Sequence, residues 1–188
     1  KKEDKEVYPW TILVAKVVSE LENHIKGRQQ VFAAGAIEGK ECTWLLEPFI
    51  QEDMINTIFG MGSSGKTLLS LYFAKDVAER LGHNILFIDY EDTKEGWKSK
   101  LDKMMQPNDF NPDLINKFFY FDSEQIPIAE QVDKIKDGVK KNDIKFVVVD
   151  SASLATGEST SDEKAAVRLV SALKLLKTTV LLIAHQRK

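Results

Sequence analysis

The segment Gly60–Thr67 reads GMGSSGKT and fits the phosphate-binding pattern G-x-x-x-x-G-K-[ST]. We expect a buried strand before it over 54–59 and a helix after it from about Lys66 to Arg80. In such a unit the backbone N–H groups of the loop and the helix N-terminus face an anion, and glycines permit its close approach. The lysine then reaches the β- and γ-phosphates, and the threonine hydroxyl binds Mg²⁺. The residues expected at the nucleotide are Gly60, Met61, Gly62, Ser63, Ser64, Gly65, Lys66, Thr67 and Leu68.

From residue 54 onward, short apolar runs alternate with amphipathic stretches of helical period. Continuous hydrophobic strands separated by helices are typical of a parallel sheet that is covered by helices on both faces. The fold class is therefore α/β. We expect strands at 54–59, 85–89, 118–121, 146–150 and 180–184, and helices at 66–80, 94–105, 127–141 and 163–176.

Ligands of parallel sheets bind at the carboxyl ends of the strands, so the residue after each strand is a candidate for chemistry. Asp150 ends the fourth strand, where a carboxylate near Thr67 can hold Mg²⁺; the alternative is a turn or a helix cap. Glu91 follows the second strand and is the candidate for polarising the attacking water. Asp92 is the second candidate for that role, or else a cap of the helix that starts near Lys94.

His185 follows the fifth strand at the same edge of the sheet. A histidine there can hydrogen-bond the γ-phosphate and report its loss, although a lone histidine at a strand end is often structural. Arg187 and Lys188 come directly afterwards. They form either an exposed basic end or a source of positive charge for the nucleotide of a neighbouring subunit.

The composition is that of a globular protein, with 43% hydrophobic and 29% charged residues. The net charge of −3 gives no overall basic field that would favour a nucleic acid. The single cysteine, Cys42, excludes an internal disulfide and fits a reducing compartment. No apolar run approaches the roughly 18 residues of a membrane-spanning helix. We expect a cytoplasmic protein without a membrane partner.

Residues 1–43 are expected to form an N-terminal tail, a helix from Trp10 to Lys26 and a connector. Residues 44–188 then form the core, and we expect this core to be truncated at its C-terminus. The apolar stretch Trp44–Ile50 is expected to pack across the edge of the sheet. The alternative is that Trp44 touches a bound base or an adjacent subunit.

The order of these motifs resembles that of the RecA-like P-loop ATPases, and within them the hexameric replicative helicases of DnaB and plasmid RepA type. Ile85–Asp92 is similar to the strand that ends in the catalytic glutamate of that group. Phe146–Ser151 resembles its Walker B strand, and Ile183–Lys188 resembles its fifth-strand motif with a sensor histidine. The phosphate loop corresponds to its Walker A motif.

This resemblance implies a sheet of order 3-2-4-5-1 and a site that uses ATP and Mg²⁺. It assigns catalytic roles to Lys66, Glu91 and His185 and metal binding to Thr67 and Asp150. It also implies a homo-oligomer, a hexameric ring with ATP at the subunit interfaces and single-stranded DNA in its channel. Family members carry further strands beyond the first, so either the core is truncated or residues 29–50 cover that edge.

Two functions fit these residues. The first is a ring-forming motor on single-stranded DNA in replication, which the RepA-like spacing of the motifs favours. The second is an ATPase switch of KaiC or RadA type that acts on a protein partner or in recombination, which the acidic balance and the loop 157–162, without aromatic residues, favour. A small-molecule kinase is a third class, but the region 94–125 contains no arginine for a lid.

Overall fold

The computed structural model describes residues 34, 39, 41–105, 112–157 and 163–185 of the 188-residue chain. Contacts divide the chain into two units, Lys1–Glu41 and Cys42–Lys188. All of the helices and strands given below belong to the second unit. The helix expected over 10–26 and the basic residues at 187 and 188 lie outside the described residues.

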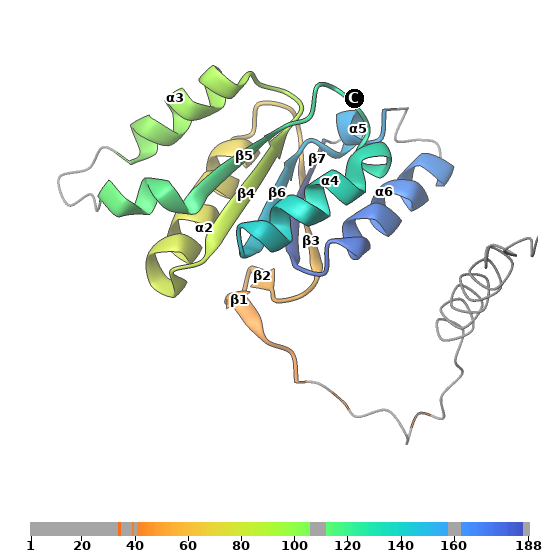
Figure 1. Cartoon of the computed structure of the whole chain (residues 1–188), viewed down its shortest axis with the longest axis horizontal. Helices are drawn as coiled ribbons and strands as arrows, with labels where there is room; N and C mark the ends of the chain where they lie inside the picture. Colours follow the sequence, from red (N-terminus) through yellow and green to blue (C-terminus); the bar gives the residue numbers. More distant parts are fainter. Residues whose placement is uncertain (1–33, 35–38, 40, 106–111, 158–162, 186–188) are drawn as a thin grey trace, which may run out of the picture. The chain divides into compact units, whose positions relative to one another are not determined.

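A parallel five-stranded sheet forms the centre of the second unit (Figure 1). Its order is β3-β7-β6-β4-β5. If these five strands are numbered 1 to 5 along the chain and read from the β5 edge, this is the predicted order 3-2-4-5-1. The strands are β3 (Ile55–Gly60), β4 (Asn84–Asp89), β5 (Phe118–Asp122), β6 (Ile144–Asp150) and β7 (Thr179–His185). In this order β7 lies between β3, which leads into the phosphate loop, and β6, which ends in Asp150.

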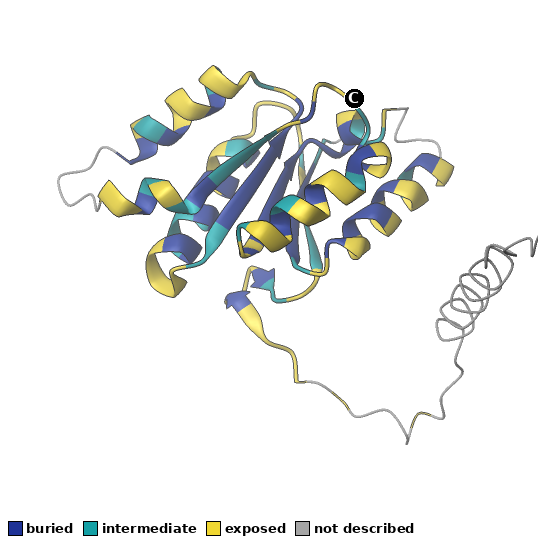
Figure 2. Cartoon of the chain, viewed as in Figure 1, coloured by how far each residue is buried: buried dark blue, intermediate teal, exposed yellow. Residues whose placement is uncertain are grey.

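Helices cover both faces of this sheet, as predicted (Figure 1). On one face, α2, α3 and a 3-10 turn bury their apolar side chains against the sheet; on the other, α4, α5 and α6 do so. Figure 2 shows the central strands buried between these two layers, because both faces of β4, β6 and β7 are covered by helices. The helices are α2 (Lys66–Leu81), α3 (Lys94–Met104), η2 (Pro112–Lys117), α4 (Ile128–Lys141), α5 (Ala152–Ala155) and α6 (Glu163–Leu175).

The predicted boundaries of the core elements agree with the structure to within two residues. Gly82 ends α2 in the left-handed region (φ 67°), where a side chain would be strained. The helical elements that we did not predict are short: α5 has one turn, and η2 is a 3-10 segment. Both segments are too short for a periodic pattern of apolar residues to be recognised in the sequence. No helix within the described ranges has the length and apolarity to cross a bilayer.

The strands β1 (Trp44–Leu46) and β2 (Ile50–Gln51) pair with each other and form a separate antiparallel sheet. Leu45, Leu46 and Ile50 are buried in the same core cluster as α2, and the ring of Phe49 stacks on Phe73 at 5.4 Å. At the edge of the large sheet, the Gln51 backbone N–H donates to the Asn56 Oδ1 of β3 at 2.9 Å, so the hairpin lies at the sheet edge as expected. The hairpin thus packs against α2 and also contacts the edge strand β3, without joining the five-stranded sheet.

Candidate nucleotide site

The phosphate loop connects β3 to α2 in a conformation that its residues make possible. Gly65, the N-cap residue of α2, has φ 83°, a left-handed value that a glycine adopts without strain. Lys66 is 6% exposed, and its ammonium donates to the carbonyl oxygens of Gly60 (3.1 Å) and Met61 (2.6 Å). The loop therefore surrounds a buried positive charge at the N-terminus of a 16-residue helix, where a phosphate is favoured.

Asp150 lies beneath this loop at the end of β6 and is 2% exposed. Its Oδ2 accepts a hydrogen bond from the Thr67 hydroxyl at 2.5 Å. Its Oδ1 is buried and has no hydrogen-bond partner among the described residues, so this oxygen has a lone pair available for a cation or its water. The N-cap of the next helix, α5, is Ser151, so Asp150 is not the helix cap that we considered.

Burial raises the pKa of Asp150 to about 6, and the negative charges of Glu91 and Asp89 add to this effect. The Thr67 hydrogen bond and His185 oppose it. A divalent cation would remove this charge repulsion. Thr67 and Asp150 together therefore fit the oxygen ligands that Mg²⁺ takes, and the unpartnered Oδ1 is the observation that supports this fit.

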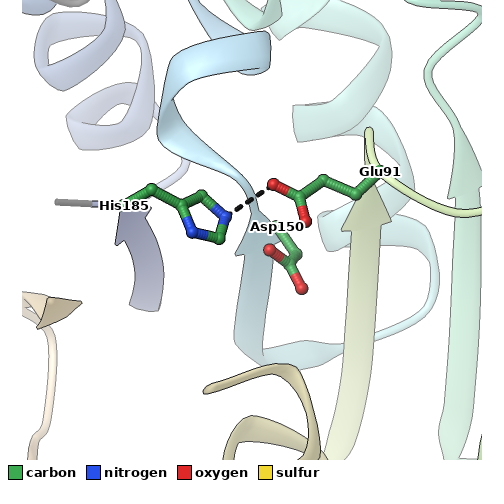
Figure 3. A group of neighbouring side chains, drawn as sticks. All are labelled: Glu91, Asp150 and His185. Atoms are coloured by element: carbon green, nitrogen blue, oxygen red, sulfur yellow. Dashed lines mark hydrogen bonds and ion pairs between the residues drawn. The ribbon is translucent and has the colours of Figure 1, made fainter. Parts of the chain in front are cut away.

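Glu91 and His185 meet above Asp150, although they come from strands that are not neighbours (Figure 3). The His185 Nε2 lies 2.6 Å from the Glu91 Oε1. One ligand atom from each of Glu91, Asp150 and His185 can be chosen so that all three lie within 4.8 Å of one another. The register explains this: the Cα partners of Asp150 are Asp89 and Ile183, and Glu91 and His185 each follow two residues later.

Asp92 is not part of this cluster. Its Oδ2 pairs with the Lys100 ammonium at 2.8 Å, and its Oδ1 accepts the N–H of Thr93. The helix α3 is capped by Thr93, whose hydroxyl accepts the N–H of Gly96, so the expected cap role of Asp92 is wrong. The Lys100 bond lowers the pKa of Asp92.

A cavity of about 460 Å³ connects the loop to the cluster. Glu91, His185 and Lys100 line it from the far side, and the loop and the start of α2 line the near side with Ser63, Ser64, Gly65, Lys66, Thr67, Leu68 and Leu71. Gly60, Met61 and Gly62 are not among its lining residues. Lys100 could not be predicted as a site residue, because the sequence of a helix with several lysines does not indicate which of their side chains lines the cavity.

A larger hollow of about 540 Å³ borders His185 from the α5 and α6 side. Its lining includes Phe59, Leu169, Val170 and Leu182, and among the described residues that line it His185 is the one that titrates. A triphosphate needs positive charges and backbone N–H groups. The smaller, polar cavity at the phosphate loop is therefore the candidate nucleotide site.

A protein-family model described as an AAA domain matches residues 23–188. The chain belongs to this family. It is thus a P-loop ATPase of the AAA type, and the phosphate loop, the Asp150 strand and the Glu91–His185 pair all lie inside the matched region. No curated protein matches the chain. The matched region begins within the segment that we expect to be the N-terminal helix and connector.

Proposed function

We propose that the chain hydrolyses ATP with Mg²⁺, and that residues 44–188 form its catalytic core. The observation that carries this proposal is the meeting of Glu91 and His185 at 2.6 Å beside the cavity that Lys66 and Thr67 line from the other side. A carboxylate placed across from a phosphate loop is suited to act on a water molecule in line with the terminal phosphate.

In this proposal the loop amides from Gly60 to Leu68 and the Lys66 ammonium bind the β- and γ-phosphates. Thr67 and Asp150 hold Mg²⁺, which neutralises the phosphate charge when it is bound. Glu91 orients the attacking water and accepts its proton. The carboxylate has two oxygens, so Oε1 can stay with His185 while Oε2 receives the proton.

His185 has two roles in the proposal. Its Nε2 fixes the Glu91 carboxylate, and its position beside Gly60, at the end of the neighbouring strand, lets the ring contact the γ-phosphate. Lys100 adds a positive charge from the same chain on the far side of the cavity. Burial lowers the pKa of Lys100, but its bond to Asp92 and the charges of Asp89 and Asp150 outweigh this and raise it, so the side chain stays charged.

We further propose that the ATPase is a homo-oligomeric, ring-forming motor on single-stranded DNA in replication. The strand order and the places of Glu91 and His185 support this, because they match what the helicase resemblance implies. The alternative is a switch that acts on a protein partner or in recombination. The net charge of −3 favours that alternative, since a DNA motor normally presents a basic surface to its substrate.

The test is ATP hydrolysis by the purified chain with and without single-stranded DNA, together with the particle mass in solution. A ring-sized particle whose hydrolysis rises with DNA is expected for the motor. A monomer that hydrolyses ATP and is indifferent to DNA would favour the switch. No hydrolysis in Mg²⁺ under either condition would overturn the proposed activity itself.

A further inference from the structure

Asp89 is a buried carboxylate that the proposed mechanism does not use. It is the last residue of β4 and is 4% exposed. Its Cα partners are Asp150 on one neighbouring strand and Asp122 on the other. Because residues in parallel register face the same side of a sheet, the Asp89 side chain lies on the α2 and α3 side together with that of Asp150.

A buried carboxylate needs hydrogen bonds to offset the loss of water. One oxygen of Asp89, Oδ1, accepts the backbone N–H of Glu91 at 2.8 Å and the backbone N–H of Asp92 at 3.0 Å. Both amides lie just past the end of β4, where the chain leaves the ladder of the sheet. A single side-chain oxygen thus sets the direction in which the backbone turns at Glu91.

Tyr90 holds the same turn from the opposite face of the sheet. Its N–H donates to the Asp150 carbonyl at 2.5 Å, and its hydroxyl donates to the Ile126 carbonyl at 2.8 Å. The Gln125 amide donates to the Tyr90 carbonyl at 3.0 Å. The backbone before Glu91 is therefore fixed to β6 and to the loop that follows β5, while Asp89 fixes the amide of Glu91 itself.

We propose that Asp89 is a positioning residue, whose carboxylate holds the turn that carries the Glu91 side chain to His185 and over Asp150. This inference rests on the proposed role of Glu91 in hydrolysis. The distance from Glu91 to His185 depends on where the turn places the Glu91 Cα. A displacement of about 1 Å of a reacting group can cost up to roughly 100-fold in rate, so loss of the two hydrogen bonds affects turnover more than nucleotide binding.

The neighbouring strand provides a matched control. Asp122 ends β5 and is exposed, and its Oδ1 accepts the backbone N–H of Glu124 at 3.2 Å. This is a turn of the same kind, but it carries no residue of the nucleotide cavity. Asp122→Ala therefore reports what the loss of a strand-end carboxylate does when no site residue depends on it.

The experiment compares Asp89→Ala, Asp89→Asn and Asp122→Ala by steady-state ATP hydrolysis, with thermal unfolding as a check of the fold. We expect D89A to lower kcat about 10-fold or more with KM changed by less than about threefold. D89N keeps an acceptor oxygen and should recover most of the loss, whereas D122A should match the wild type. Should D89A not fold, D89S takes its place, with kcat expected between those of D89N and Glu91→Gln.

A double mutant decides whether Asp89 acts through Glu91. In the background of Glu91→Gln, the added D89A change should cost less than about twofold, because the group that it positions is already disabled. The inference is overturned if D89A turns over ATP like the wild type, or if it lowers the residual rate of E91Q by its full factor. If the wild type itself does not hydrolyse ATP, the proposed function has failed instead.

Discussion

The imidazole of His185 and the carboxylate of Glu91 lie 2.6 Å apart across a strand that belongs to neither of them (Figure 3). His185 ends β7 and Glu91 follows β4, while β6, between the two, carries Asp150 beneath the pair. The side chains of Glu91 and His185 are 38% and 29% exposed, so water reaches the carboxylate that we assign to activate it.

Glu91→Gln should separate nucleotide binding from turnover. Glutamine keeps the size and a hydrogen-bond acceptor for His185, but it cannot take a proton from water. We expect kcat to fall by roughly 100-fold or more while the affinity for ATP changes less than about threefold. Equilibrium binding of a fluorescent ATP analogue and steady-state hydrolysis measure the two quantities.

Glu95→Gln is the control for this change, since Glu95 is exposed in the first turn of α3 and does not line the cavity. E95Q should keep the wild-type rate. If E91Q hydrolyses ATP at the wild-type rate, the carboxylate of Glu91 is not the group that accepts the proton.

His185→Ala should reduce the discrimination between ATP and ADP. In the proposed mechanism the ring contacts the terminal phosphate, so its removal should weaken ATP binding and leave ADP binding nearly unchanged. We expect the ratio of the two dissociation constants to shrink about fivefold or more, in line with the loss of a hydrogen bond to a charged group. The measurement is best made in the E91Q background, where ATP is not consumed.

His83→Ala, with His83 in the turn before β4, controls for the loss of an imidazole outside the site. A preference for ATP over ADP in H185A equal to that of H83A would show that His185 serves only to hold Glu91.

Lys100→Ala should weaken the binding of ATP in a salt-dependent manner. The Lys100 side chain lines the cavity and is 48% exposed, so its attraction for the triphosphate is screened by ions. We expect a loss of about three- to tenfold in affinity at low salt that becomes smaller as salt is added. Binding titrations at two salt concentrations measure it.

Lys103→Ala is the matched change, on the exposed side of the same helix. If K100A and K103A bind ATP equally well, the charge of Lys100 does not act on the nucleotide.

The sheet and its site edge could be predicted because their signals are local and strong. The strands are continuous apolar runs, and the loop at Gly60–Thr67 has a fixed spacing. Asp150, Glu91 and His185 could be found because each follows a buried strand, and parallel strands end at one edge. Their 2.6 Å contact and the unpartnered oxygen of Asp150 depend on the strand order, which these local patterns do not contain.

The supporting residues could not be predicted, because their partners depend on which way a side chain turns. Asp89, Asp92 and Lys100 are ordinary charged residues in the sequence. In the structure Asp92 binds Lys100, and Asp89 turns inward to two backbone amides. The stretch that forms the hairpin β1–β2 was expected at the sheet edge, where it does contact β3, but its sequence does not indicate that it also packs against α2.

Tyr90→Phe should change the pH dependence of folding at alkaline pH. Burial raises the pKa of Tyr90 to about 12 from the ordinary 10.0, while its Gln131 hydrogen bond acts in the opposite direction. Between these values the folded chain keeps a proton that the unfolded chain loses, so the contribution of Tyr90 to the free energy of unfolding falls as the pH rises. Below about pH 10 the contribution is intact.

At about pH 8 the wild type should be more stable than Y90F by about 1 kcal/mol, the value of the hydrogen bond from the Tyr90 hydroxyl to Ile126. Between pH 10 and pH 11 ionisation of Tyr90 in the unfolded chain lowers the free energy of unfolding of the wild type by roughly 1.4 kcal/mol. The stability advantage of the wild type over Y90F should therefore disappear or reverse near pH 11. Tyr120, whose pKa burial also raises to about 12, is present in both proteins and cancels in the comparison.

Urea unfolding of both proteins at the two pH values measures the difference, and Tyr72→Phe on the exposed side of α2 controls for loss of a hydroxyl. A difference between wild type and Y90F that stays constant with pH would mean that Tyr90 ionises as readily in the folded chain as in the unfolded one. Equal stability of the two proteins at pH 8 would mean that the Tyr90 hydroxyl does not hold the turn before Glu91.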